Sequence, residues 1–338
     1  MGSGCSTACK KACSTNAIAV MEDQELKLIE WKATKLIEWK ATKPIYRYHW
    51  WPMRYARGSS LHNNIYSDHG GLDIYDKLMG TKSKEYQKTH YFRSTISDKS
   101  DSLWAGFCDK ATILSCLYEY PKHSVIVKKQ NSDLEFEFTP LSIEVLMMVA
   151  CNNTIKTNMS IFLGERNYSK TKTNKPEPLP GDLLDMMHIL CSSKEAFAMD
   201  IDSGPAVWNY SYDSVTVNSY AEFPPRTHRP SGDYFPHTKP EDGTTEYLNF
   251  IINSSAYPEK NQNLWGYINT VLIPTADEII EKKTQAWISK IHPDFIWKHY
   301  PTNSPWEGKC EINPEVDAGL VYQIYKKSMI ESSLPLII

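Results

Sequence analysis

The sequence predicts an α+β protein in which one helix carries a cysteine and packs on an antiparallel β-sheet. Three observations predict this class. A helical pattern lies early, over residues 104–118, strand-like segments dominate after residue 196, and helices and strands do not alternate regularly as they would around a parallel sheet. With 338 residues, of which 41% are hydrophobic, the chain is long enough to bury a large core.

Composition weighs against several classes of function. The formal net charge of −3 gives no electrostatic reason to expect a nucleic-acid partner. No apolar stretch is long enough to cross a bilayer, and the first residues lack the apolar segment of a secretory signal. Neither a transmembrane helix nor a cleavable signal peptide is therefore expected.

The cysteines form no Cys-x-x-Cys pair, and no acidic cluster has calcium-loop spacing. No metal site and no cofactor are expected, while a calcium requirement stays open.

Residues 1–44 are expected to form a flexible N-terminal arm ahead of one catalytic domain over residues 45–330. The first six residues have the form of an N-myristoylation signal at Gly2, with Cys5 as a candidate palmitate acceptor, and a tail of small residues is the alternative. The octapeptide KLIEWKAT then occurs twice, over residues 27–34 and 35–42. A period of eight makes no coiled-coil seam. A tolerant, duplicated arm is favoured over a segment that lies on a lipid surface.

Apolar periodicity and turn residues place the elements in order along the rest of the chain. Helices are expected over residues 72–78, 104–118, 142–151 and 275–290. Strands are expected over residues 124–128, 134–138, 185–190, 196–201, 205–220, 245–252 and 264–273.

Cys108 is the first candidate for chemistry. It stands at the start of the predicted helix over 104–118, where the helix dipole and unpaired N–H groups lower a thiol pKa. Gly106, two residues earlier, allows a close approach of backbone. The alternative is an ordinary buried cysteine, since free cysteine is among the most buried residue types.

His188 and Asp200 complete a Cys, His, Asp order along the chain, which is the order of a thiol triad. If residues 185–190 and 196–201 pair as a hairpin, these two side chains lie opposite each other on one face. Asp202, two residues along, is the second candidate to orient the histidine. The alternative is a strand histidine that bonds a backbone group. His123, in a loop, is a weaker candidate base.

Several short segments of the sequence, taken in their order along the chain, resemble segments of the transglutaminase-elicitor family, the oomycete cell-wall transglutaminases and their bacterial relatives. The patches lie between about residues 45 and 300, and the strongest are the Trp-x-Gly-x-Cys-x-x-Ala stretch at Trp104–Ala111, Pro121–Phe138, Phe162–Arg166, Pro180–Ile189, and Phe197–Asp200 followed by Val207–Asn209. Two weaker ones are Trp50–Pro52 and His292–Trp297.

The resemblance implies a papain-like or transglutaminase-like core and a protein-glutamine γ-glutamyltransferase. Cys108 would attack a glutamine carboxamide, His188 would act as base and then acid, and Asp200 would orient it. The indole N–H of Trp51 or Trp104 is the candidate second donor to the oxyanion, with core packing as the alternative for each. A glutamine deamidase or a papain-like cysteine protease would use the same triad. A non-catalytic protein-binding module is the alternative of another class.

The expected partners are protein substrates, one that supplies a glutamine and one that supplies a lysine amine. A lipidation-like N-terminus ahead of such a core resembles a secreted bacterial effector that acts in a host cell. Membrane association through Gly2 and Cys5 is expected in that case.

Overall fold

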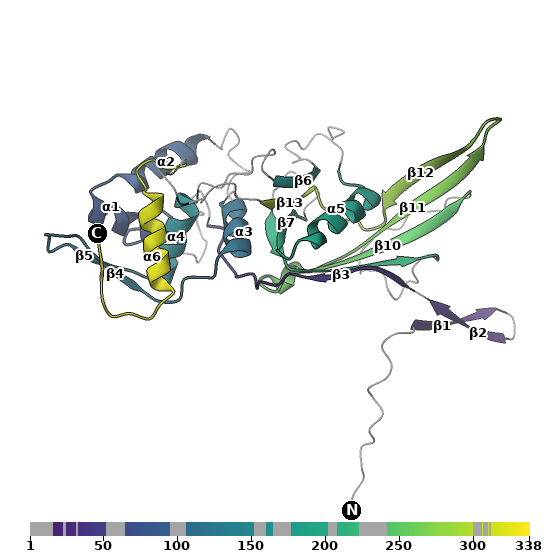
Figure 1. Cartoon of the computed structure of the whole chain (residues 1–338), viewed down its shortest axis with the longest axis horizontal. Coiled ribbons are helices and arrows are strands. Elements are labelled where there is room, and N and C mark those ends of the chain that lie inside the picture. The colour runs from purple at the N-terminus through teal and green to yellow at the C-terminus, as the bar shows by residue number, and fades with distance from the viewer. Residues whose placement is uncertain are drawn as a thin grey trace, which may run out of the picture.

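The computed structural model describes residues 16–22, 25–31, 33–51, 65–94, 106–151, 160–164, 177–201, 208–222, 242–299, 306, 310 and 312–338. These residues form an α+β structure whose sheets are antiparallel apart from one parallel pair, β14 with β4. The predicted α+β class is therefore confirmed at this level. Figure 1 shows a helical part at one end and a long sheet at the other, with α3 between them.

The helical part contains five helices, and all but the second supply described side chains to one core. They are α1 (Gly71–Met79), α2 (Ser83–Ser94), α3 (Cys108–Leu117), α4 (Pro140–Ala150) and α6 (Ala318–Ser328). A small sheet joins them, with strands β4 (Val125–Lys128), β5 (Glu135–Phe138) and β14 (Leu336–Ile337). Helix α4 is buried over most of its length, which makes it the centre of this core.

Capping explains where α4 and α6 begin. Thr139 accepts a hydrogen bond from the Ser142 N–H through its side chain, and Pro140 occupies the first helical position, where a missing N–H costs nothing. The Asp317 carboxylate accepts from the Leu320 N–H in the same way. The structure confirms the helix that the sequence predicts over residues 142–151, with its start two residues earlier.

The other part of the molecule contains two antiparallel sheets. The larger has the order β12-β11-β10-β9-β3, and the smaller has the order β6-β13-β7-β8. The larger sheet consists of β3 (Thr34–Lys40), β9 (Ser214–Tyr220), β10 (Thr244–Asn253), β11 (Gln262–Pro274) and β12 (Ile279–Trp287). The smaller consists of β6 (Ser160–Gly164), β7 (Phe197–Asp200), β8 (Asn209–Tyr212) and β13 (Phe295–His299).

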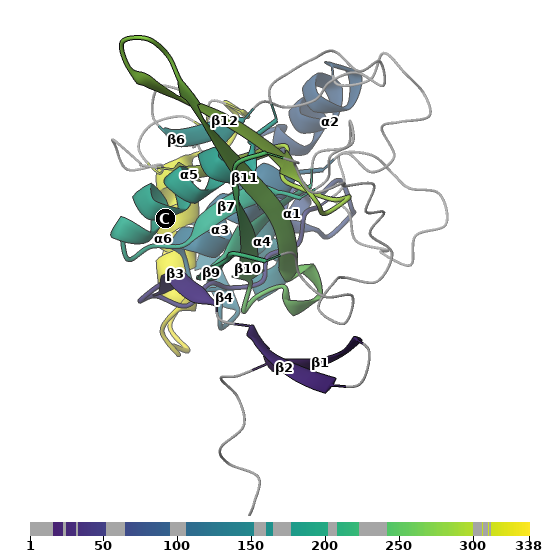
Figure 2. The same cartoon turned by 90° about the vertical axis from the view of Figure 1, so that its right-hand side faces the viewer.

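Helix α5 (Pro180–Ser192) packs against these sheets and forms a second core with them. Figure 2 shows α5 beside the long strands β10, β11 and β12, and it shows the β11–β12 hairpin reaching beyond the body. A separate hairpin of β1 (Asn16–Glu22) and β2 (Glu25–Trp31) hangs away from the body in both views.

Strand β7 contributes to both cores because its side chains alternate between the two faces of the sheet. Phe197 and Met199 belong to the core that contains α5, whereas Ala198 belongs to the core of the helical part. Helix α3 packs on β7 and β8 from that second side. Helices α3 and α5 therefore cover opposite faces of β7.

Most predicted elements are confirmed within a few residues, among them α1, α3, α4, the β4–β5 pair, β7 and the β10–β11 hairpin. Three are wrong. Residues 185–190 lie in α5 rather than in a strand, and residues 279–287 form strand β12 rather than a helix. The single strand expected over residues 205–220 is two strands, β8 and β9, which belong to different sheets. The second copy of the octapeptide forms β3, so it belongs to the sheet and not to a free arm. The C-terminal residues also pair with β4, beyond the expected end of the domain.

In the part of the chain that the structure describes, no helix has the length and apolar character needed to cross a membrane.

Candidate thiol site

Cys108 is the first residue of α3, as the sequence predicts. The residue before it, Phe107, donates its N–H to the carbonyl oxygens of Trp50 and Trp51, at 2.6 and 3.2 Å. Gly106 lies directly under the Trp50 ring, and a Cβ there would stand 2.2 Å from a ring carbon. The absence of a side chain at Gly106 thus makes room for the Trp50 indole ring. The hydrogen bonds from Phe107 hold the start of α3 against residues 50 and 51.

Asn209 holds the sulfur of Cys108. Its side-chain amide donates to Cys108 Sγ at 3.8 Å, and its backbone N–H also bonds the sulfur. The indole of Trp297 can only donate, and it donates to Asn209 Oδ1 at 2.9 Å, so the amide nitrogen must face the thiol. Thr112, one turn further along α3, donates to the Asn209 carbonyl at 3.0 Å. Sequence reasoning placed Asn209 only within a family motif and gave it no role.

Asp200 lies beside this pair. It is fully buried at the end of β7 and stands opposite Asn209 in the β7–β8 register. Its Oδ1 accepts the backbone N–H of Trp208 at 3.0 Å, and its charge acts on the Cys108 thiol. The structure therefore brings together two of the three predicted catalytic residues, Cys108 and Asp200.

The pKa of Cys108 is raised to about 11. Burial of the sulfur is the largest cause, and the negative charges of Asp109 and Asp200 act in the same direction. The two hydrogen bonds from Asn209 oppose this shift because they stabilise the thiolate. At neutral pH the resting group is a thiol, so nucleophilic attack requires a base that removes its proton.

His188 does not meet that requirement. It lies on α5, its side chain is exposed, and α5 packs on the face of β7 opposite to α3. Strand β7 pairs with β8 and β13, so the predicted hairpin that would set His188 across from Asp200 does not exist. The structure does not bring His188 to Cys108.

Trp51 remains a candidate donor to a reacting oxygen. It is 5% exposed, and in the described part of the chain its indole nitrogen is buried without a hydrogen-bond acceptor. Its backbone has a φ of 32°, which is uncommon for a bulky residue and typical of functional sites. Trp104 and Asp202, the other candidate donor and the second orienting carboxylate, lie outside the described residues, as do Gly2 and Cys5.

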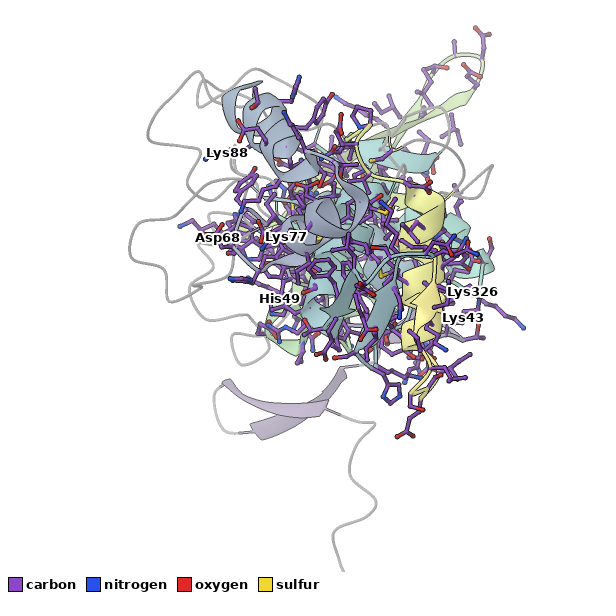
Figure 3. The ribbon with its side chains drawn as sticks, turned by 90° about the vertical axis from the view of Figure 1, so that its left-hand side faces the viewer. Lys43, His49, Asp68, Lys77, Lys88 and Lys326 are labelled. Carbon is purple, nitrogen blue, oxygen red and sulfur yellow. The ribbon has the colours of Figure 1, made fainter. Side chains whose placement is uncertain are left out.

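His49 is a histidine that sequence reasoning missed. It precedes Trp50 on the segment that borders the start of α3, and its Nδ1 lies 3.2 Å from Glu144 Oε2. The Glu144 side chain is fully buried and also accepts from the Tyr120 hydroxyl at 2.9 Å. The pKa of His49 is raised, mainly by its hydrogen bond to Glu144. Its side chain, labelled in Figure 3, is 55% exposed, so it can exchange protons with solvent.

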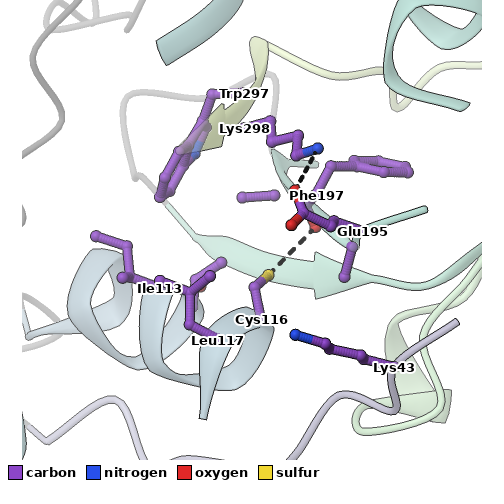
Figure 4. Close-up of a pocket in the computed structure, with 11 residues that line it drawn as sticks. Lys43, Ile113, Cys116, Leu117, Glu195, Phe197, Trp297 and Lys298 are labelled. Carbon is purple, nitrogen blue, oxygen red and sulfur yellow. Dashed lines mark hydrogen bonds and ion pairs between the residues drawn. The ribbon is translucent and has the colours of Figure 1, made fainter. Parts of the chain in front are cut away.

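A small cavity of about 50 Å³, partly open to solvent, lies between α3 and β7. Thr112 and Trp297 line it, and these two residues also hold Asn209. Figure 4 shows Cys116 and the Lys298–Glu195 ion pair in this cavity, with the Lys298 amine 2.8 Å from Glu195. Burial raises the pKa of Cys116 to about 12. The cavity therefore adjoins the Cys108 site and contains a second, still less acidic thiol.

No group of three or more metal-ligating side chains occurs among the described residues. No family model, curated protein or solved structure matches the chain.

Proposed function

We propose that Cys108 is the nucleophile of a transglutaminase-like thiol acyltransferase. The observation that carries the proposal is the position of its sulfur, at the first residue of α3 and held by Asn209 beside Asp200. A helix that presents a thiol to an antiparallel sheet is also the arrangement that a papain-like core requires. The β7–β8 pair under α3 supports that finer description of the fold.

In the proposed reaction the Cys108 thiolate attacks the carboxamide carbon of a protein glutamine. The carbon–nitrogen bond breaks, ammonia leaves with the proton that the base took from the thiol, and a thioester remains. A lysine amine then attacks the thioester, the carbon–sulfur bond breaks, and the thiol is regenerated as the isopeptide forms. Water in place of the amine would give deamidation, and a peptide bond in place of the carboxamide would give proteolysis.

We assign the role of the base to His49 in place of His188, because His49 precedes Trp50, whose carbonyl accepts the N–H of Phe107 next to Cys108. Glu144 binds His49 Nδ1, which leaves Nε2 as the nitrogen that exchanges a proton with the reacting groups. The indole N–H of Trp51 supplies a donor for the developing oxyanion, next to the N–H groups at the start of α3. Asp200 acts on the Cys108 sulfur and accepts the backbone N–H of Trp208.

The test is incorporation of a fluorescent primary amine into a glutamine-rich acceptor protein. Cys108→Ala should abolish incorporation, whereas Cys116→Ala, a matched change on the same helix, should not. His49→Asn should reduce the rate by about 10²-fold or more, and His188→Asn should leave it unchanged. Incorporation that persists in Cys108→Ala, or that depends on His188, would refute this assignment.

A second candidate is a non-catalytic protein-binding module. The raised pKa of Cys108 favours it, because a thiol of pKa about 11 beside two carboxylates is a poor nucleophile without an effective base. Wild-type protein that neither incorporates amine, releases ammonia nor cleaves the acceptor, and whose Cys108 resists a thiol-reactive probe, would decide for this candidate.

We further propose that the protein acts as a secreted effector at host membranes, through acylation of Gly2 with Cys5 as the second acyl site. The form of the first six residues supports this. Gly2→Ala should move the protein from membranes to the cytosol when it is expressed in a eukaryotic cell. An unchanged distribution would refute the idea.

A further inference from the structure

The second copy of the octapeptide KLIEWKAT, residues 35–42, occupies one edge of the large sheet, paired with β9. Ile37 is 6% exposed and belongs to the core under the sheet. The Trp39 indole donates to the Ser193 carbonyl at 2.9 Å. The Ala41 N–H donates to the Asp213 carbonyl at 2.8 Å, and Thr42 donates to the Lys194 carbonyl at 3.0 Å. The edge of β9 and the carbonyl groups of Ser193, Lys194 and Asp213 thus form a binding surface for this sequence.

The first copy, residues 27–34, carries the same side chain at every one of these contact positions. Ile29, Trp31, Ala33 and Thr34 are the equivalents of the four residues that dock. Strand side chains alternate with a period of two, so a shift by an odd number of residues would turn the apolar set to solvent. A shift by eight is even, and it keeps the same side chains facing the core.

We propose that the edge of β9 is a binding site for this octapeptide that either copy can occupy. When the first copy replaces the second, the docked sequence stays the same, but the segments that precede and follow it change. The link between the docked Thr and the buried Ile45 lengthens from two residues, 43–44, to ten, 35–44. Loop-closure entropy then disfavours the shifted register by about tenfold. The isolated β1–β2 hairpin, which the shift also disrupts, is a type of structure that is marginal in water.

The exchange has a consequence for the thiol site. Residues 45–51 lead from β3 to the carbonyl groups of Trp50 and Trp51, which receive the Phe107 N–H. In the shifted register these residues are tethered to the sheet by a link eight residues longer. Exchange of the two copies at the edge of β9 therefore changes the length of the link between the large sheet and the start of α3. This inference does not depend on the proposed function.

The test uses a disulfide that reports the shifted register. In the observed register Glu38 stands opposite Thr216, so in the shifted register Glu30 takes that place. Full-length protein with Glu30→Cys and Thr216→Cys is oxidised, and the bond is located by peptide mass spectrometry. Because the bond traps the shifted register and accumulates with time, the quantity compared is its initial rate of formation, expected to be about one-tenth of that of the matched pair in the observed register. A Glu38→Cys and Thr216→Cys pair reports the observed register as the matched control.

Two further changes bias the equilibrium. Ile37→Asp places a carboxylate in the core only in the observed register, so it should raise the 30–216 bond to the majority while the protein stays folded. Ile29→Asp places it there only in the shifted register and should abolish that bond. The two changes together should lower the unfolding temperature far more than the sum of the two alone. The proposal is overturned if Ile37→Asp unfolds the protein as the double change does, or leaves it folded without the 30–216 bond.

Discussion

At the scale of single residues, the chemistry depends on which groups stabilise the charged form of the Cys108 sulfur. Two N–H groups of Asn209 favour the thiolate, and burial, Asp109 and Asp200 oppose it. Asn209 can do this because Trp297 and Thr112 fix the orientation of its amide and its carbonyl. Asn209 is therefore a positioning residue, and its hydrogen bonds lower the pKa of the Cys108 thiol.

Asn209→Ala should therefore raise the pKa of Cys108 further above about 11. A loss of about one pKa unit of stabilisation would slow alkylation of Cys108 at pH 8 about tenfold, because only the thiolate reacts. The measurement is the rate of iodoacetamide labelling of Cys108 between pH 7 and pH 10. Trp297→Phe, which removes only the indole donor to the amide, should cause a smaller decrease. Equal rates in wild type and Asn209→Ala would contradict this account.

The His49–Glu144 pair gives a second prediction at this scale. The pKa of His49 is raised in the folded protein, so its contribution to stability is complete below the unfolded value of about 6.5 and is lost as pH rises through the folded value. Glu144→Gln removes the charge that causes the shift. An NMR titration of the His49 ring should show a lower pKa in Glu144→Gln than in wild type. A pKa that does not fall would separate His49 from Glu144 and weaken its assignment as the base.

The residue scale also shows where sequence reasoning could not reach. The sequence placed Cys108 at a helix start and Asp200 at a strand end, and both placements are confirmed. Asn209 and His49 were missed because their roles come from contacts across 101 and 95 residues of chain, to Cys108 and Glu144 respectively. No local pattern carries that information. The buried Glu144 in an apolar helix was the one available signal, since such a carboxylate needs a partner.

At the scale of elements, α5 shows how a wrong period leads to a wrong site. Leu183, Met186, Met187 and Leu190 recur at i, i+3, i+4 and i+7, which is a helical pattern, and all four are buried. Pro180 at the first position and Asp182 in the first turn are further helix signals. The sequence-based expectation was instead a short strand over residues 185–190, paired with residues 196–201. On the helix, His188 falls between the buried positions and faces solvent.

Strand β12 is the second element that was assigned incorrectly. Its sequence, IIEKKTQAW, has no strict alternation of apolar and polar residues, so the local pattern does not identify a strand. The pairing partner does. It pairs with β11 over nine residues, and a turn closes the hairpin through the Thr275 N–H and the Glu278 carbonyl at 2.8 Å. Tertiary pairing thus overrode the local pattern, as is common for exposed strands.

The hairpin tip carries apolar side chains that the two cores do not use. Ile279 is 68% exposed and Ile280 is 46% exposed. Replacing both with Thr should change the free energy of unfolding by less than about 0.5 kcal/mol, because no buried contact is lost. Phe250→Ala, in the same sheet but fully buried, should cost about 3–5 kcal/mol. Urea denaturation of the three proteins gives the comparison, and a large loss at the tip would show that this hairpin is packed against something in solution.

At the scale of the whole molecule, the site lies where the two cores meet. Helix α3 is held on one side by α4 and residues 45–51 and on the other by β7 and β8. The α+β class and the order of most elements could be predicted because they depend on local periodicity and caps. The division into two cores that share β7 could not, because it follows from β7 pairing with β13, almost 100 residues away in the chain.

The central claim is that Cys108 forms a covalent acyl-enzyme. The most direct measurement is the intact mass of the protein after incubation with a glutamine-bearing peptide and an acid quench. The account predicts an adduct of the peptide mass less ammonia on wild type and on Cys116→Ala, and none on Cys108→Ala. An adduct that survives in Cys108→Ala, or a wild-type protein that forms none under conditions in which an alkylating reagent also leaves Cys108 unmodified, would contradict it.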